Sequence, residues 1–172
     1  RGAASVFGVI LGTGVGGGVT IDGKLVAGAN LIAGEWGHNP LPWPDDAKRP
    51  GRRCYCGKQG CIETFLSGPG LRADHETVAG NSLTPNEILK RSETGDETAE
   101  AALRRYEKRL AKALASVMNI LDPEVVVLGG GLSNIDRLYL NVPELWREFV
   151  FSDTVRTRLV KAEHGDSSGV RG

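Results

Sequence analysis

This sequence of 172 residues has only three cysteines. It has no long apolar run and no excess of either charge. Three cysteines are an odd number, which argues against a closed set of disulfides and predicts a reducing, cytoplasmic setting. Lys plus Arg and Asp plus Glu both total 21, so no basic excess indicates a nucleic-acid partner. No apolar run approaches the roughly 20 residues that a membrane-spanning helix needs. We therefore expect one globular domain with no nucleic-acid partner and no membrane span.

Glycine, in contrast, is abundant, and its 24 residues are clustered. The first cluster, Gly12 to Gly18, follows an apolar run at 5–11 that predicts a buried strand. Its spacing matches the dinucleotide-binding motif, but that motif needs a helix directly after the glycines. Here the turn signal Asp22-Gly23 between two short runs predicts a β-hairpin instead. Two interpretations stay open for the cluster: a backbone cradle for phosphate, or a tight turn without a ligand.

The second half of the sequence predicts a helix followed by a strand. An apolar stripe at 98–121 indicates a long amphipathic helix that Asp122-Pro123 ends. The run 124–128 is almost wholly apolar, as in a strand buried on both faces of a parallel sheet. Basic side chains on the other faces of the long helix are predicted to be solvated: Arg104, Arg105, Lys108, Arg109 and Lys112.

A second glycine cluster, Gly129-Gly130-Gly131, comes directly after that strand. A helical stretch at about 142–149 and a last strand at 155–162 follow it. This order places the cluster at the carboxyl end of a strand, where open α/β sheets bind their ligands. A simple turn between a strand and a helix is the alternative.

All three cysteines and one of the three histidines lie in a short stretch of the chain. His38, Cys54, Cys56 and Cys61 supply the three thiolates and one imidazole of a closed structural zinc site. Gly57 and Gly60 between the last two thiols allow a tight turn. A disulfide such as Cys54–Cys61, or free buried thiols, are the alternatives. We expect residues 39–62 to form a zinc-loop insert, exposed and irregular over its proline-rich first part.

Two carboxylates flank this metal set. Glu35 lies three residues before His38, and Glu63 lies two residues after Cys61. A metal that draws His38 towards Cys61 brings both carboxylates together, and the second ring nitrogen of His38 stays available for another partner. Such a group of acceptors suits the hydroxyls of a sugar. A glycosidase pair formed by Glu35 and Glu63 is the competing interpretation.

The motif Glu35-x-Gly-His38 with Cys54-x-Cys56-Gly-x-x-Gly-Cys61-x-Glu63 resembles the signature of the ROK family of sugar kinases and sugar-responsive repressors. Within that family, four segments are most similar to bacterial fructokinases of the mannofructokinase type: 34–43, 54–67, 119–134 and 164–172. The resemblance implies an α/β fold of the actin-like ATPase (ribonuclease H-like) class, a mixed sheet with flanking helices and a zinc-binding loop.

The resemblance also implies a role for each motif. His38, Cys54, Cys56 and Cys61 would bind zinc, and Glu35, His38 and Glu63 would hold sugar hydroxyls. The phosphates of MgATP would lie against Gly12, Thr13, Gly14, Gly16, Gly17 and Gly18. The nucleoside would lie against Gly129, Gly130 and Gly131.

Two features of the family are absent from the sequence. Family kinases carry an Asp-x-Gly-Gly-Thr-Lys phosphate loop and an Asn-Asp pair that supplies the general base, both ahead of the region matched here. We therefore expect 1–172 to be the large C-terminal domain of a fructokinase, inactive without its N-terminal domain and dimeric in the full-length protein. A repressor's effector domain, or a glucokinase or N-acetylhexosamine kinase, is the alternative.

Overall fold

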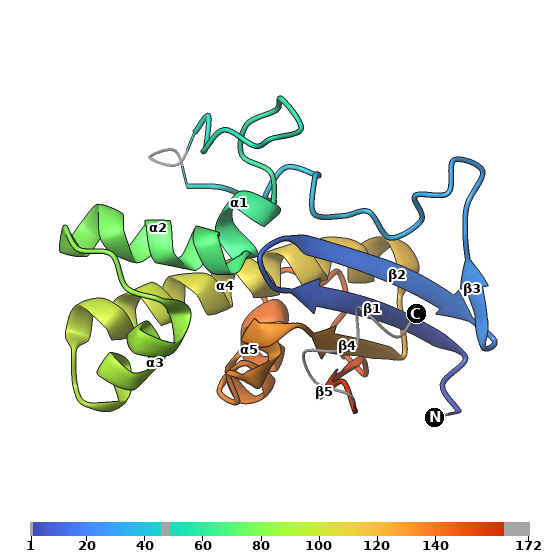
Figure 1. Cartoon of the computed structure of the whole chain (residues 1–172). Helices are drawn as coiled ribbons and strands as arrows, with labels where there is room; N and C mark the ends of the chain where they lie inside the picture. Colours follow the sequence, from blue (N-terminus) through green and yellow to red (C-terminus); the bar gives the residue numbers. More distant parts are fainter. Residues whose placement is uncertain (1, 46–48, 164–172) are drawn as a thin grey trace.

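Five strands form one mixed sheet in residues 2–45 and 49–163, the part of the chain that the computed structural model describes. The strand order is β3-β2-β1-β4-β5 (Figure 1). β1 pairs with β2 and β2 with β3 in antiparallel fashion, whereas β1–β4 and β4–β5 are parallel. The bounds are β1 Ser5–Leu11, β2 Val15–Ile21, β3 Lys24–Val26, β4 Val125–Gly129 and β5 Arg158–Lys161. The expected mixed α/β sheet is therefore confirmed.

The hairpin between β2 and β3 forms at the predicted Asp22-Gly23 turn. Both residues have positive φ angles, 48° and 73°, as the favoured two-residue hairpin turns require. The last strand is shorter than the predicted 155–162, because only Arg158–Lys161 pair with β4.

Helices pack on one face of the sheet and beside its edge (Figure 1). They are α1 Glu63–Leu66, α2 Gly68–Ala79, α3 Pro85–Glu93, α4 Glu97–Leu121, the 3₁₀ helix η2 Gly131–Asn134, and α5 Leu138–Trp146. The predicted long helix is confirmed as α4, which Asp96 caps by accepting from the N–H groups of Thr98 and Ala99. The helix expected at about 142–149 begins and ends earlier, as α5. Thr84 and Glu87 form a capping box at the start of α3.

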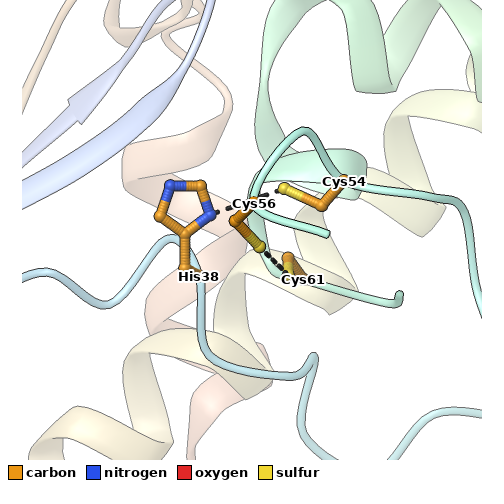
Figure 2. Close-up of side chains that lie close together, drawn as sticks. All are labelled: His38, Cys54, Cys56 and Cys61. Atoms are coloured by element: carbon orange, nitrogen blue, oxygen red, sulfur yellow. Dashed lines mark hydrogen bonds between the residues drawn. The ribbon is translucent and has the colours of Figure 1, made fainter. Parts of the chain in front are cut away.

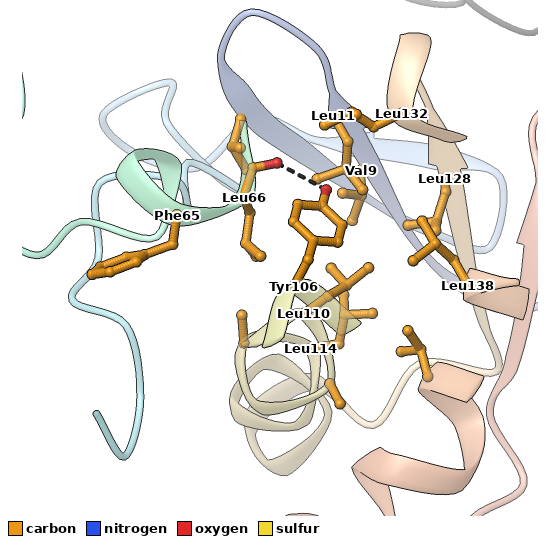
Figure 3. Packing of buried hydrophobic residues seen from close by; sticks show 14 of the residues in the cluster. Val9, Leu11, Phe65, Leu66, Tyr106, Leu110, Leu114, Leu128, Leu132 and Leu138 are labelled. Atoms are coloured by element: carbon orange, nitrogen blue, oxygen red, sulfur yellow. Dashed lines mark hydrogen bonds between the residues drawn. The ribbon is translucent and has the colours of Figure 1, made fainter. Parts of the chain in front are cut away.

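The core lies between α4 and the strands β1 and β4. Alternate residues of β1 are buried, Phe7, Val9 and Leu11, which is the pattern of a strand covered on one face. Figure 3 shows Val9, Leu11 and Leu128 close to Tyr106, Leu110 and Leu114 of α4. The hydroxyl of the fully buried Tyr106 donates to the Leu66 carbonyl at 2.9 Å, so α4 also fixes the junction of α1 and α2.

The prediction that all the basic side chains of the long helix are solvated is wrong for two of them. Arg109 and Lys112 are buried instead of solvated, because Arg109 pairs with the buried Asp74 at 2.6 Å and Lys112 donates to the Trp43 carbonyl at 2.6 Å. Gly68-Pro69-Gly70 forms the first turn of α2, where Pro has no N–H bond to lose.

The segment 164–172, which contributes to the family resemblance, and residues 46–48 of the proline-rich loop lie outside the described residues. Among the described helices, none combines the length and the apolar character that crossing a membrane requires.

Candidate functional site

The four predicted metal ligands meet in one cluster (Figure 2). One nitrogen or sulfur atom from each of His38, Cys54, Cys56 and Cys61 lies within 4.8 Å of the others. The Cys56 and Cys61 sulfurs are 3.6 Å apart, and Cys54 Sγ is 3.5 Å from His38 Nδ1. A tetrahedral zinc with bonds of about 2.3 Å to sulfur separates its ligand atoms by roughly 3.8 Å. The donor set and its spacing therefore fit zinc, and the three cysteines form no disulfide.

The loop that presents these ligands is folded by its own backbone. Cys54 N–H donates to the Lys58 carbonyl at 2.9 Å, and Gly60 N–H donates to the Arg52 carbonyl at 2.9 Å. Gly57 and Gly60 have φ angles of 88° and 72°, which only glycine adopts without strain. The result is a tight turn that places Cys54 and Cys56 against Cys61.

The pKa values of Cys56 and Cys61 are shifted in opposite directions. Burial, followed by hydrogen bonds with Cys56 and Cys54, raises the pKa of Cys61 to about 12. A backbone hydrogen bond from Lys58 lowers the pKa of Cys56. Three neighbouring thiols cannot all ionise unless a cation compensates their charge. A divalent metal at this cluster would supply that compensation.

The carboxylate of Glu63 lies between this cluster and the turn that joins β1 to β2. Glu63 Oε2 accepts the Val15 backbone N–H at 2.9 Å, and Glu63 Oε1 is 4.0 Å from Cys54 Sγ. A Cβ atom added at Gly14 would lie 2.8 Å from the same Oε2. The turn therefore needs glycine at position 14 to admit this carboxylate.

His38 uses its second ring nitrogen in a way that the sequence did not predict. Its Nε2 atom is 2.8 Å from the Tyr55 hydroxyl, and the two rings meet edge to face at 5.0 Å. The charge of Glu63, followed by burial, Cys54 and Glu35, raises the pKa of Tyr55. Glu35 itself is exposed. Tyr55 was missed, although its position between two metal-ligating cysteines could have indicated it.

Glycine in β2 and in the segment at 34–37 lets these two backbones approach closely. A Cβ at Gly17 would lie 2.9 Å from the Gly34 carbonyl oxygen, and one at Gly37 would lie 2.0 Å from that of Val15. The segment that carries Glu35 and His38 therefore lies directly on β2. The prediction that Gly16, Gly17 and Gly18 face ATP phosphates stays a prediction.

A cavity of about 650 Å³ lies on the other side of the same turn. It is bordered by the carboxyl end of β1, the start of η2, and the N-termini of α2 and α3. Its lining includes Gly12, Thr13, Gly68, Pro69, Pro85 and Gly131. Helix N-termini favour negatively charged groups, so the cavity suits an anionic ligand. Gly129 and Gly130 come directly before Gly131 in the chain but are not among the residues that line the cavity. Gly130 packs so closely on Leu11 that an added Cβ would lie 2.5 Å from the Leu11 carbonyl oxygen.

A model of the ROK family matches residues 1–172. The chain belongs to the ROK family. It is 42% identical over 176 residues to an N-acetyl-D-glucosamine kinase of Photobacterium profundum, a match that covers 100% of this chain and 58% of that protein. The chain thus spans little more than half the length of this curated relative.

Two solved structures have the same fold. The ROK hexokinase from Thermus thermophilus superposes with a TM-score of 0.84 at 29% identity, over 98% of this chain and 55% of that one. A ROK glucokinase from Streptomyces griseus, in complex with glucose and AMPPNP, gives a TM-score of 0.82 at 26% identity, over 98% of this chain and 59% of that one. The expected actin-like ATPase fold is confirmed by these relationships.

Proposed function

We propose that this chain forms the sugar- and nucleotide-binding part of an ATP-dependent hexose kinase. One observation carries the proposal: a single turn, residues 12–15, contacts both candidate sites. Gly12 and Thr13 line the cavity between the helix N-termini, while Val15 donates to the Glu63 carboxylate beside the metal cluster. A phosphate in the cavity and a sugar at the carboxylate would meet at this turn. That juxtaposition is what phosphoryl transfer requires.

The proposed roles follow from the chemistry of each group. Glu35, His38 and Glu63 hold sugar hydroxyls, with Glu63 oriented by the Val15 N–H. The cavity holds MgATP, with its phosphates at Gly12 and Thr13 and its nucleoside towards Gly129, Gly130 and Gly131. Zinc at His38, Cys54, Cys56 and Cys61 is structural, because four protein ligands leave no position for water. It fixes the loop from which Glu63 extends.

We propose N-acetyl-D-glucosamine as the sugar. The expectation of a fructokinase gains no support from the curated relatives reported above, because the 42% identical relative is an N-acetyl-D-glucosamine kinase. This favours the N-acetylhexosamine kinase alternative over fructose. Fructose stays the second candidate only because the segments at 34–43, 54–67, 119–134 and 164–172 resemble fructokinases.

In the proposed kinase, the general base and the Asp-x-Gly-Gly-Thr-Lys loop belong to residues outside this sequence. Activity is therefore tested on the full-length protein, and the chain of 172 residues alone is expected to be inactive. A homodimer of the full-length protein and a cytoplasmic location stay predictions.

The test is ADP formation by the full-length protein with MgATP and a panel of N-acetyl-D-glucosamine, fructose, glucose and mannose. We expect the highest kcat/KM with N-acetyl-D-glucosamine. A higher value with fructose would restore the fructokinase assignment. Sugar binding without ADP formation for any panel member would favour the repressor alternative.

A matched pair of variants tests the site itself. Glu63→Gln keeps an oxygen that can accept from Val15 but removes the charge, and should weaken sugar binding by about 10- to 100-fold. Glu76→Gln removes an exposed carboxylate from α2 and should leave sugar binding unchanged. Equal affinities for the two variants would contradict the role of Glu63.

A further inference from the structure

Tyr55 is an exposed tyrosine of the metal loop, and its hydroxyl contacts one of the predicted metal ligands. Its side chain is 83% exposed, and the ring meets His38 edge to face. Its backbone lies between Cys54 and Cys56, so the metal loop fixes where the side chain starts. The hydroxyl lies 2.8 Å from His38 Nε2.

The hydrogen-bonding capacity of His38 makes this contact significant. Each ring nitrogen of a histidine can form one bond in the plane of the ring, either as a donor or as an acceptor. Nδ1 faces the Cys54 sulfur at 3.5 Å, on the side of the metal cluster. Nε2 is the only nitrogen left for a ligand, and the Tyr55 hydroxyl holds it. A sugar hydroxyl and Tyr55 cannot both bond this atom.

Tyr55 can leave this position at about the net cost of one hydrogen bond. The residue is 83% exposed, so its ring loses few packing contacts when it rotates about its side-chain bonds. His38, in contrast, is held by the segment that lies on β2 and, in the proposed holo form, by zinc. The movable partner of the pair is therefore the tyrosine.

We propose that Tyr55 is a competitor for the sugar site: its hydroxyl holds the ligand position on His38 Nε2, and the sugar must displace it to bind. This proposal rests on the proposed function, because it takes His38 as a sugar ligand. Tyr55 would thereby help to set the affinity for sugar. A sugar with a hydroxyl directed at His38 Nε2 replaces the bond that Tyr55 gives up, whereas a sugar without a hydroxyl at that place does not.

The test compares sugar binding to the zinc-loaded, full-length protein and its Tyr55→Phe variant by calorimetry with N-acetyl-D-glucosamine. Phenylalanine keeps the ring and removes the competing hydroxyl. We expect Tyr55→Phe to bind the sugar about three- to tenfold more tightly, the ratio that one ordinary hydrogen bond provides. Tyr139→Phe removes a hydroxyl that donates to the Ser133 carbonyl at 2.7 Å, away from the cluster, and should leave sugar affinity unchanged.

A second measurement follows the histidine directly. In ¹⁵N-labelled protein, the Nε2 resonance of His38 should shift on the Tyr55→Phe change without sugar, and on sugar addition to the unsubstituted protein. Zinc content should be the same in both proteins. Equal or weaker sugar binding by Tyr55→Phe, or a loss of zinc from it, would overturn the competition. Absence of sugar binding to the unsubstituted protein would instead overturn the proposed function, and this proposal with it.

Discussion

Glu63 Oε2 accepts the Val15 N–H at 2.9 Å, across 48 positions of the sequence. This one bond joins the end of the metal loop to the turn between β1 and β2. Because the carboxylate has two oxygens, Oε1 remains for other partners while Oε2 is held. The bond therefore orients the carboxylate that we assign to the sugar.

Gly14→Ala should disturb this relationship selectively. The added Cβ would lie 2.8 Å from Glu63 Oε2, the far end of a flexible side chain. The carboxylate can move aside at small cost in stability, but it then loses its bond to Val15. We expect about tenfold weaker sugar binding, measured by calorimetry, with little change in the melting temperature.

Gly16→Ala is the matched control for that experiment. It lies two positions further along the chain, and an added Cβ there meets nothing within 4 Å. Sugar affinity should be retained. If both variants bind sugar as the unsubstituted protein does, the Glu63–Val15 bond has no role in sugar binding.

The sequence was most informative where a local pattern has one physical meaning. The apolar stripe of α4 and the Asp22-Gly23 hairpin each depend on neighbouring residues alone, and each forms as predicted. The clustering of His38 with the three cysteines was predictable for a different reason, because these four residues are the donor set of a structural zinc site.

Features that depend on packing between distant segments could not be predicted. The sequence around Lys112 predicts a solvated basic face, but its ammonium group donates to the Trp43 carbonyl, 69 positions away. The contact of Tyr55 with His38 depends on how the metal loop folds back. Gly17 and Gly37 permit a close approach of two backbones that no local pattern indicates.

Arg52 should be essential for anchoring the metal loop. Its Nη1 atom donates to the Thr64 carbonyl at 3.0 Å and to the Gly70 carbonyl at 2.9 Å, and its guanidinium lies over the Phe65 ring. Arg52→Met leaves two partly buried carbonyls without this donor. We expect a loss of about 1–3 kcal/mol in the free energy of unfolding, measured with urea.

The neighbouring Arg53 supplies the control. It is exposed, and Arg53→Met should change the free energy of unfolding by less than about 0.5 kcal/mol, as surface substitutions usually do. Arg52→Met should also bind zinc less tightly than Arg53→Met, because Arg52 holds the loop next to Cys54. Similar stabilities for the two variants would show that Arg52 does not anchor the loop.

Metal removal should loosen the loop and weaken sugar binding together. We expect one equivalent of zinc in reduced, carefully prepared protein by elemental analysis, and almost none in Cys61→Ser. Chelation should lower the melting temperature, and adding zinc back should restore it along with sugar affinity. Much less than one equivalent in the unsubstituted protein would contradict the assignment of His38, Cys54, Cys56 and Cys61 to zinc.

The stability of the helical layer should fall in acid through Glu100. Hydrogen bonds from Arg137, followed by those from Ser92 and Arg104, lower the pKa of Glu100 below its ordinary 4.5, although burial opposes this. Arg137 Nη1 donates to Glu100 Oε2 at 2.6 Å and so joins the residue before α5 to α4. A carboxylate with a lowered folded-state pKa stabilises the protein above its unfolded-state pKa. That contribution is complete above about pH 5 and is lost as the pH falls below 4.5 towards the folded-state value.

Glu100→Gln isolates this effect, because glutamine is neutral at every pH. We expect the variant to be about 1–3 kcal/mol less stable than the unsubstituted protein at pH 7, with the difference shrinking steadily below pH 4.5. Urea unfolding at pH 7, 5, 4 and 3 measures it. Glu144→Gln is the control, since Glu144 is exposed and its pair with Arg147 contributes little. A stability difference for Glu100→Gln that stayed constant with pH would show that the charge of Glu100 is not what holds α4 to α5.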